Sequence, residues 1–213
     1  MKLLAISNPT FIPDEAALIN SLFREGLVCL HIRKPESCED EFRALITKIE
    51  PEFLERIALH QHHHLAEEFV IRRLHFTEKD RKMTAPEMLK NLKSSNFLLS
   101  TSIHDLEETD HLSLHFSYTF FGPVFDSISK SGYKGALPNN LYIKPEIKKI
   151  PIIGLGGISI KNVAKVREMN FDGAAILGSL WQETEYTISN FRKIRDVVIN
   201  ELTGNIIKPM NRI

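Results

Sequence analysis

The sequence has few cysteines and no excess of either charge, and each shortage excludes a class of protein. Its two cysteines, Cys29 and Cys38, cannot form the disulfide framework that stabilises small secreted domains, so we expect a reduced, cytoplasmic protein. Lys and Arg together number 27, as do Asp and Glu, which gives a formal net charge of zero. A nucleic-acid-binding surface usually shows as a basic excess, so we expect no nucleic-acid partner.

Long hydrophobic runs are also missing. The first apolar run covers residues 3–6, which is shorter than the roughly 7–15 residues at the core of a signal peptide. The longest weakly polar stretch, 150–158, is interrupted by Pro151 and three glycines and falls far short of the ~20 residues that span a bilayer. We therefore expect no membrane partner.

What the chain does contain is a regular alternation of short apolar runs and helix-like segments. Continuous short apolar runs are typical of parallel strands that are buried on both faces. The last helix-like segment, 183–202, places Ile188, Phe191, Ile194 and Val198 on one side. The apolar runs lie at 3–6, 27–32, 57–59, 74–76, 97–99, 118–121, 152–155 and 174–177.

This alternation predicts an α/β fold. Eight strand–helix units in 213 residues leave about 27 residues for each unit, which fits a compact (β/α)8 TIM barrel. No linker or low-complexity tract marks a boundary, so we expect a single domain over residues 1–213. A doubly wound open sheet is the alternative, because alternation alone does not distinguish a closed sheet from an open one.

Two glycine pairs stand where a barrel carries its active site, just after strands. Gly156 and Gly157 follow the seventh run, and Gly178 with Ser179 follows the eighth. Loops at these places often bind phosphate, because glycine lets backbone N–H groups approach an anion. The alternative is that these glycines only make tight turns.

A third loop, 122–130, carries a different set of anion-binding groups. Ser127, Ser129 and Lys130 offer two hydroxyls and an ammonium group within four residues, which suits phosphate oxygens. A solvated loop without a ligand is the alternative interpretation.

Nine histidines raise the question of a metal site. His60, His62 and His64 alternate, so in a strand they would share one face, and zinc ligation would be geometrically feasible. No cysteine pair or His-Glu-x-x-His spacing accompanies them, so we favour a solvent-facing strand end. His75, inside the fourth run, is expected to be a hydrogen-bonded core or rim residue rather than a ligand.

Several segments taken together resemble one family, the thiamine phosphate synthase/TenI group of phosphate-binding (β/α)8 barrels. They occur in the order and at the spacings of that family and cover essentially residues 1–180. The segments are 30–33 (Leu-His-Ile-Arg), 74–76 (Leu-His-Phe) with Asp80, 102–104 (Ser-Ile-His), 118–130 with its Gly-Pro-Val-Phe core, 151–162 with its Gly-Gly-Ile, and 173–179.

The family contains two chemistries, and the resemblance implies that both bind a thiazole phosphate in the loops described above. Synthases join a pyrimidine pyrophosphate to a thiazole phosphate and release pyrophosphate with the help of magnesium. TenI-like members are thiazole tautomerases, which move a proton so that the ring of a thiazole carboxylate phosphate becomes aromatic.

The chain departs from the synthase pattern after its second and third strands. Synthases usually carry Gln-Leu-Arg-Asp-Lys where this chain has the segment 31–35, His-Ile-Arg-Lys-Pro. Histidine at position 31 is similar to TenI-like members, and Lys34 would have to replace the missing lysine. The Asn-Asp-Arg of synthases becomes His-Gln-His at 60–62, and the carbonyl of Gln61 is a poor substitute for a magnesium-binding carboxylate. Asp80 aligns with the second magnesium aspartate and is kept.

These departures favour a TenI-like thiazole tautomerase that needs no cofactor. His104 aligns with the histidine that acts in TenI-like enzymes, and an imidazole can take and return a proton near neutral pH. Arg33 and His31 would orient the substrate. The residues expected to bind the substrate and its phosphate are Ser102, Ser127, Ser129, Lys130, Gly156, Gly157, Gly178 and Ser179.

Two alternatives stay open. One is a thiamine phosphate synthase with an altered site, in which Asp80 would hold magnesium. The other is a non-catalytic or regulatory protein that binds a phosphorylated ligand on the same scaffold. The expected partner is a small phosphorylated thiazole, and homo-oligomer formation is left open.

Overall fold

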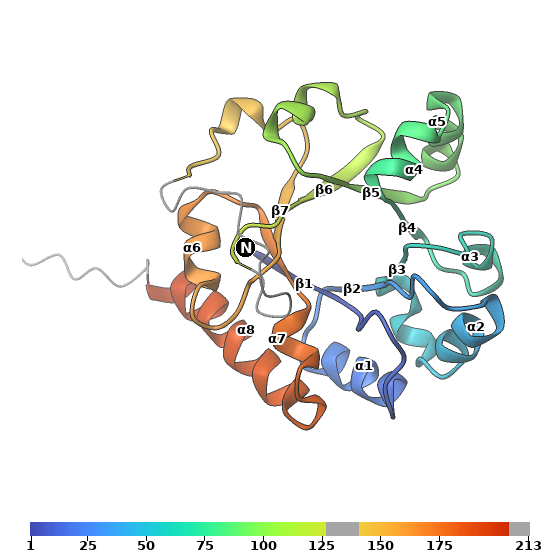
Figure 1. The fold of residues 1–213 in the computed structure, drawn as a ribbon, viewed down its shortest axis with the longest axis horizontal. Helices are drawn as coiled ribbons and strands as arrows, with labels where there is room; N and C mark the ends of the chain where they lie inside the picture. The colour runs from blue at the N-terminus through green and yellow to red at the C-terminus, as the bar shows by residue number, and fades with distance from the viewer. Residues whose placement is uncertain (127–140, 205–213) are drawn as a thin grey trace, which may run out of the picture.

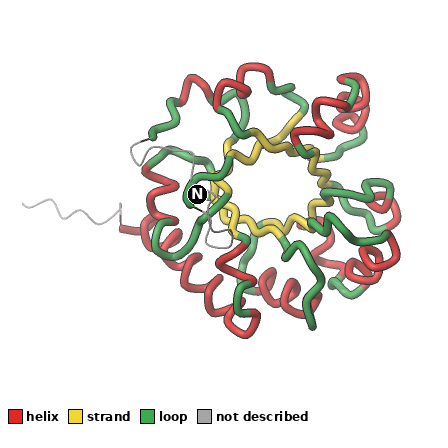
Figure 2. Tube along the Cα trace, in the orientation of Figure 1, coloured by secondary structure: helices red, strands yellow, loops and turns green. Residues whose placement is uncertain are grey.

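The computed structural model describes residues 1–126 and 141–204, with side chains through residue 199. Eight strands pair in parallel in chain order, and β8 pairs with β1, so the sheet is closed (Figure 2). The predicted (β/α)8 barrel is therefore confirmed, and the open-sheet alternative is wrong. The strands are β1 (Lys2–Ile6), β2 (Cys29–Ile32), β3 (Ile57–Leu59), β4 (Arg73–Phe76), β5 (Leu98–Ile103), β6 (Phe116–Phe121), β7 (Ile152–Leu155) and β8 (Gly173–Ile176).

Helices surround the barrel on its outer side (Figure 1). The segment predicted as the last helix forms a 3-10 turn followed by α8, in which Phe191, Ile194 and Val198 are buried as expected. In the described part of the chain, no helix has the length and apolar character needed to cross a bilayer. The helices are α1 (Glu15–Arg24), α2 (Glu39–Thr47), α3 (Leu65–Glu68), α4 (Glu78–Met83), α5 (Pro86–Ser94), α6 (Val163–Glu168), α7 (Gly178–Trp181) and α8 (Thr187–Gly204), with 3-10 helices η1 (Pro51–Arg56), η2 (Leu106–His111), η3 (Pro145–Ile147) and η4 (Thr184–Tyr186).

Side chains alternate along each strand, and this alternation divides the core into two clusters. Leu3 and Ala5 of β1 belong to the large cluster between the strands and the helices. Leu4 and Ile6 of the same strand belong to the smaller cluster inside the barrel. The members of this inner cluster are Leu4, Ile6, Cys29, Ala58, Phe120, Ile153 and Ala175.

The interior of the barrel is apolar on one side and polar on the other. β1, β7 and β8 contribute all the aliphatic members of the inner cluster except Ala58, which comes from β3. In contrast, β2, β4, β5 and β6 place hydrogen-bonded polar side chains inside. Those of β5 explain why this strand is longer than the apolar run 97–99 predicted. A run of apolar residues cannot mark a strand whose inward positions carry hydroxyl groups. The polar inward residues are His31, His75, Ser100, Ser102 and Tyr118.

Candidate active site

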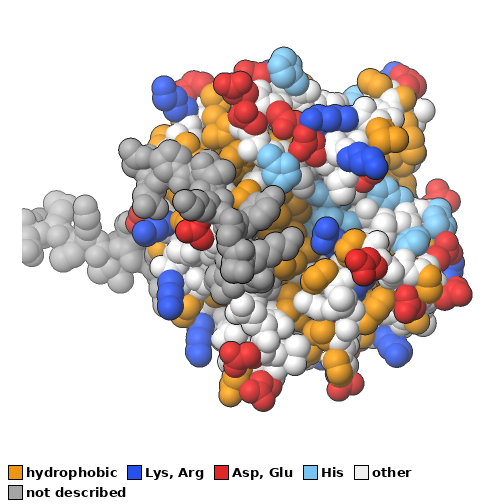
Figure 3. Space-filling model, viewed as in Figure 1, with side chains coloured by type: hydrophobic (Ala, Val, Ile, Leu, Met, Phe, Trp, Pro, Cys, Tyr) orange, Lys and Arg blue, Asp and Glu red, His pale blue; other side chains and the backbone are white. Residues whose placement is uncertain are grey.

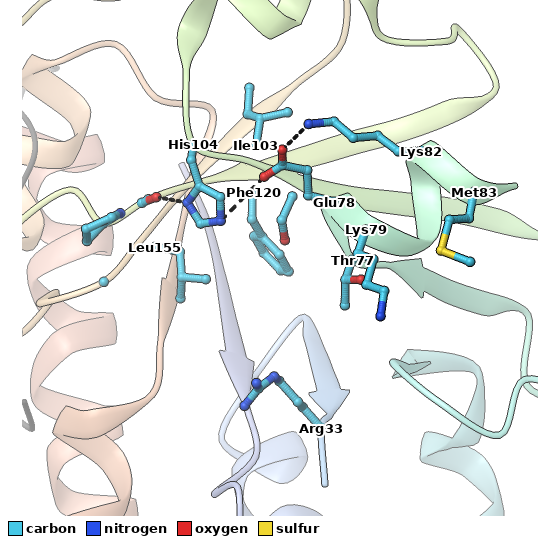
Figure 4. Close-up of a pocket in the computed structure, with 14 residues that line it drawn as sticks. Arg33, Thr77, Glu78, Lys79, Lys82, Met83, Ile103, His104, Phe120 and Leu155 are labelled. Atoms are coloured by element: carbon cyan, nitrogen blue, oxygen red, sulfur yellow. Dashed lines mark hydrogen bonds and ion pairs between the residues drawn. The ribbon is translucent and has the colours of Figure 1, made fainter. Parts of the chain in front are cut away.

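A cavity of about 800 Å³ opens at the ends of the strands, where the sequence predicted the active site. Four of the predicted residues, Arg33, Ser102, His104 and Gly156, line it together. Figure 4 shows His104 and Arg33 on opposite sides of the opening. The full lining is Arg33, Thr77, Glu78, Lys79, Lys82, Met83, Ser102, Ile103, His104, Phe120, Gly122, Pro123, Leu155 and Gly156.

His104 is held by one ring nitrogen and leaves the other free to react. Its Nδ1 lies 2.6 Å from the carbonyl oxygen of Gly122, so Nδ1 carries the proton that it donates there. Its Nε2 lies 3.8 Å from Oε2 of Glu78 (Figure 4). The Gly122 carbonyl thus fixes the tautomer in which Nε2 is unprotonated, and the Glu78 carboxylate lies on the side of this nitrogen.

Glu78 is a site residue that the sequence interpretation missed. It accepts a hydrogen bond from Lys82, and this contact, set against a smaller desolvation effect, lowers the pKa of the Glu78 carboxyl. The residue is placed by the start of α4, where the hydroxyl of Thr77 accepts from the backbone N–H of Asp80. This N-cap pattern is readable in the sequence and would have pointed to the first turn of α4 as part of the site.

The two glycine loops line a second, smaller cavity of about 240 Å³. Gly156, Gly157, Gly178 and Ser179 all border it, as predicted for a phosphate site. The hydroxyl of Ser179 is buried there, and none of the described residues forms a hydrogen bond with it. Since a buried hydroxyl normally has a partner, this group is available to a ligand.

Gly156 and Gly157 are required by the backbone as well as by the cavity. Their φ angles are +98° and +64°, a region that residues with a Cβ seldom adopt. A Cβ on Gly157 would also lie 2.4 Å from the carbonyl oxygen of Asp126. The tight-turn interpretation therefore applies to these glycines, and it is compatible with the anion-site interpretation.

Arg33 connects the two cavities, because it lines both of them together with Leu155 and Gly156. Its backbone is fixed by the buried hydroxyl of Ser7, which accepts from the Arg33 N–H at 2.9 Å and donates to the Arg33 carbonyl at 3.2 Å. Arg33 therefore lies at the junction of the two cavities, where a ligand that filled both would contact it.

His31 does not occupy the position expected of a residue that orients the substrate. It is buried inside the barrel and lines neither cavity. Its Nδ1 lies 3.0 Å from Nε2 of His60, and its Nε2 lies 2.6 Å from the hydroxyl of Tyr118. Burial, with a smaller effect of Arg73, lowers the pKa of His31 to about 3, so the ring is neutral. This placement gives no support to direct contact with a substrate.

Ser102 borders the large cavity and also contacts the barrel interior, because its hydroxyl lies 3.1 Å from Nε2 of His75. His75 is buried and bonded to two serines, which agrees with its expected place as a satisfied core histidine. The other predicted phosphate-binding residues, Ser127, Ser129 and Lys130, lie outside the described residues.

The residues aligned with the synthase magnesium site do not form such a site here. The amide of Gln61 is used to bind the β2–α2 loop: its Oε1 accepts from the Lys34 N–H at 3.1 Å, and its Nε2 donates to the Lys34 carbonyl. Asp80 accepts from the Thr77 hydroxyl at 2.6 Å and lines neither cavity. One carboxylate turned to its own helix cap does not offer the set of anionic oxygens that magnesium prefers.

Lys34 does not take the place of the missing synthase lysine. Its ammonium group is buried and bonded to Glu15 at 2.6 Å and to the backbone carbonyls of Asn8 and Thr10. All three ammonium protons have acceptors within the protein, so Lys34 stabilises the loop after β1 and does not face the cavity.

The alternating histidines do not share a face. β3 ends at Leu59, and His62 has a φ of +52°, so the extended geometry that alternation requires stops before it. His62 packs against Phe42, while His64 pairs with Glu39 at 2.9 Å. A zinc site made of His60, His62 and His64 is therefore excluded.

Comparison with known proteins agrees with the fold. A family model described as thiamine monophosphate synthase matches residues 3–180. The chain is 28% identical to the crystal structure of a thiamine phosphate pyrophosphorylase from Bacteroides thetaiotaomicron, with a TM-score of 0.72 over 94% of this chain and 99% of that one. A thiamine phosphate pyrophosphorylase from Pyrococcus furiosus, 18% identical, shares the fold with a TM-score of 0.74 over 93% of this chain and 96% of that one.

Curated relatives carry the same name. The chain is 26% identical over 112 residues to a thiamine-phosphate synthase from Hydrogenobaculum sp., an alignment that covers 51% of this chain and 52% of the relative. It thus spans about half the length of the curated relatives that it matches. The family match, in contrast, runs through all eight strands except for Lys2 at the start of β1, and it includes every residue that lines the two cavities. The chain therefore belongs to the thiamine monophosphate synthase family.

Proposed function

We propose that the protein is a thiazole tautomerase that acts on a phosphorylated thiazole of thiamine biosynthesis, with His104 as its acid and base. The observation that carries the proposal is the fixed ring of His104, whose Nδ1 is bonded to the Gly122 carbonyl while Nε2 borders a cavity of about 800 Å³. A single group that both takes and returns a proton is sufficient for a tautomerisation.

The smaller cavity supplies a place for the phosphate of such a substrate. The unpartnered hydroxyl of Ser179 and the exposed backbone of Gly156 and Gly157 border it. Arg33 stands at the junction, where its charge would stabilise the phosphate or the carboxylate of the ligand. The thiazole ring would then extend into the larger cavity, towards His104.

The reaction needs no reagent that the protein lacks. Nε2 of His104 accepts a proton from one carbon of the substrate, and the electron pair of the broken C–H bond moves into the conjugated ring. The same nitrogen then returns the proton to a second carbon, so the product is an isomer of the substrate. Glu78 stabilises the charged ring between the two steps, because its carboxylate lies 3.8 Å from Nε2.

The second candidate is a thiamine phosphate synthase, and the names of the relatives favour it. Asp80 is the residue that would hold magnesium in that case. Against it stand the amide of Gln61 and the ammonium of Lys34, both of which are bonded within the protein. A protein that binds the ligand without turnover is the third candidate.

One experiment separates the three candidates. The purified protein is given the thiazole carboxylate phosphate tautomer, with and without EDTA, and conversion to the aromatic isomer is followed by NMR. We expect turnover that EDTA leaves unchanged, that falls by about 10²–10⁴-fold in His104→Ala, and that changes little in Asp80→Ala. Magnesium-dependent formation of thiamine phosphate from the pyrimidine pyrophosphate and thiazole phosphate, lost in Asp80→Ala, would instead establish the synthase. Binding without either conversion would establish the third candidate.

A further inference from the structure

Three histidines that the proposed function does not use meet inside the barrel. His31 comes from β2, His60 from the end of β3 and His75 from β4, so three adjacent strands fix their backbones. Each offers one ring nitrogen, and these nitrogens all lie within 4.8 Å of one another. In Figure 3, histidine side chains are visible near the middle of the face seen in Figure 1. We call His31, His60 and His75 the histidine triad.

We propose that the histidine triad binds a divalent transition-metal ion of the zinc class. Among the described residues, these are the ones whose His, Cys, Asp or Glu ligand atoms come close enough to hold a metal ion. Three imidazole nitrogens on a rigid scaffold, with a further position left for water or another ligand, form a donor set that zinc adopts in proteins. The structure carries no ion there.

Outer hydrogen bonds already orient two of the rings for such a role. The hydroxyl of Ser100 donates to the Leu74 carbonyl and therefore accepts from Nδ1 of His75 at 3.0 Å, which leaves the lone pair on Nε2. The Ser102 hydroxyl lies 3.1 Å from this Nε2, and a bound ion would replace that contact. Tyr118 contacts Nε2 of His31 at 2.6 Å and leaves Nδ1 on the side of His60. Histidine ligands of metals are typically held in this way, by a partner on the nitrogen that does not bind the metal.

Among the described residues, His60 is the ring of the triad with the fewest hydrogen-bond partners. Its Nδ1 is buried and has no hydrogen-bond partner in residues 1–126 and 141–204. Its Nε2 is shared with His31 at 3.0 Å, a contact that a metal ion would replace by two metal–nitrogen bonds. His60 is also the half-buried member of the triad, so the ion would enter along its side from the mouth of the barrel.

The electrostatics of the triad select the type of metal. The three donors are neutral nitrogens, which suit zinc, cobalt, nickel or copper, whereas magnesium prefers anionic oxygens. Arg33 and Arg73 act on these rings as positive charges, so the ion would need an anion, such as hydroxide or a ligand oxygen, in its open position.

The test uses protein purified without a histidine tag and treated with a chelator. Cobalt(II) serves as a spectroscopic probe for zinc, and the bound metal is counted by mass spectrometry after gel filtration. We expect one equivalent of cobalt with the visible absorption of a low-coordinate nitrogen site, its displacement by zinc, and no competition from magnesium.

Variants locate the ion on the triad. His60→Gln should weaken zinc binding more than about 100-fold, whereas Ser100→Ala, which removes an outer partner only, should weaken it about 10–100-fold. His62→Gln is the matched control, since His62 packs against Phe42 and lies outside the triad. Circular dichroism verifies that each variant is folded.

Two outcomes would overturn the proposal. One is wild-type protein that takes up no stoichiometric cobalt or zinc, a result that needs no variant. The other is a folded His60→Gln protein that binds the metal as the wild type does. Because metal uptake is measured without any substrate, its failure is distinct from failure of the proposed tautomerase.

Discussion

The ammonium nitrogen of Lys34 lies 2.6 Å from a carboxylate oxygen of Glu15, and both side chains are buried. Burial lowers the pKa of Lys34 and raises the pKa of Glu15, while the pairing of the two opposes both shifts. The pair connects the loop after β1 and the start of α1 with the loop after β2, and so fixes the loop that carries Arg33 and that the Gln61 side chain binds.

Removing one member of this ion pair should destabilise the folded protein. Lys34→Met leaves the Glu15 carboxylate buried without a counter-charge, and we expect the free energy of unfolding to fall by about 3–5 kcal/mol in urea titrations. The double variant Lys34→Met/Glu15→Leu should recover most of the loss. Lys90→Met, which removes an exposed pair with Glu87, is the control and should change stability by less than about 1 kcal/mol.

Gly157 and Gly26 allow backbone strain to be separated from steric contact. Both have a positive φ, but a Cβ on Gly26 meets nothing within 4 Å, whereas on Gly157 it meets backbone oxygens of Asp126 and Phe125. Gly26→Ala should therefore cost only the strain, about 1–2 kcal/mol. Gly157→Ala should cost more and should also weaken thiazole phosphate binding, measured by calorimetry, by at least about 10-fold. Equal stability losses with unchanged affinity would mean that the loop does not hold the phosphate.

Removing the hydroxyl of Ser179 should affect stability and binding in opposite directions. In the ligand-free protein, Ser179→Ala should raise the free energy of unfolding or leave it unchanged, because the variant no longer buries an unpartnered hydroxyl. Affinity for thiazole phosphate should fall about 10-fold or more, since a hydrogen bond to a charged group contributes about 1.5–3 kcal/mol. Thermal unfolding and calorimetry on the same samples check both. Ser189→Ala, in α8 with an exposed hydroxyl, should change neither.

The histidine triad should make the protein sensitive to acid. In the folded protein the pKa of His31 is about 3, and those of His60 and His75 are also well below 6.5, whereas in the unfolded chain all three would titrate near 6.5. Below pH 6.5 the unfolded chain binds protons that the native state does not, so stability falls as the pH falls.

Each such histidine contributes about 1.4 kcal/mol per pH unit, and three give a slope of up to about 4 kcal/mol per unit below pH 6. Urea unfolding between pH 7 and pH 5, with EDTA present, measures this slope. His31→Asn should reduce it by about one third. A slope that is the same in this variant as in the wild type would show that His31 is protonated in the folded protein.

The sequence predicted the barrel because its clearest signal, the spacing of apolar runs, depends on burial that every strand shares. It also predicted that Arg33, His104 and Gly156 would lie together, because the topology of a barrel brings the ends of its strands to one face. What it missed depends on contacts between strands. The alternation of His60 and His62 failed because the chain turns after Leu59, and the burial of Lys34 depends on Glu15, which lies 19 residues earlier.

Some of the inward-facing residues could be predicted from the sequence. Ser100 and Ser102 of β5 alternate with Leu99, Thr101 and Ile103, so a two-residue period separates the interior from the exterior. The meeting of histidines from three strands was not readable, because it depends on the register, in which Leu59 of β3 pairs with Leu74 of β4 and so brings His60 beside His75.

The two-sided strands of this barrel have an evolutionary consequence. Side chains that point outward hold the helices, and side chains that point inward contact the ligand region, so the two sets can change separately. A lineage could replace His31 or Ser102 without disturbing the packing of Leu30 or Ile103 on the other face of the same strands. New chemistry can therefore arise in such a barrel by exchange of interior residues, while the exterior keeps the chain folded throughout the transition.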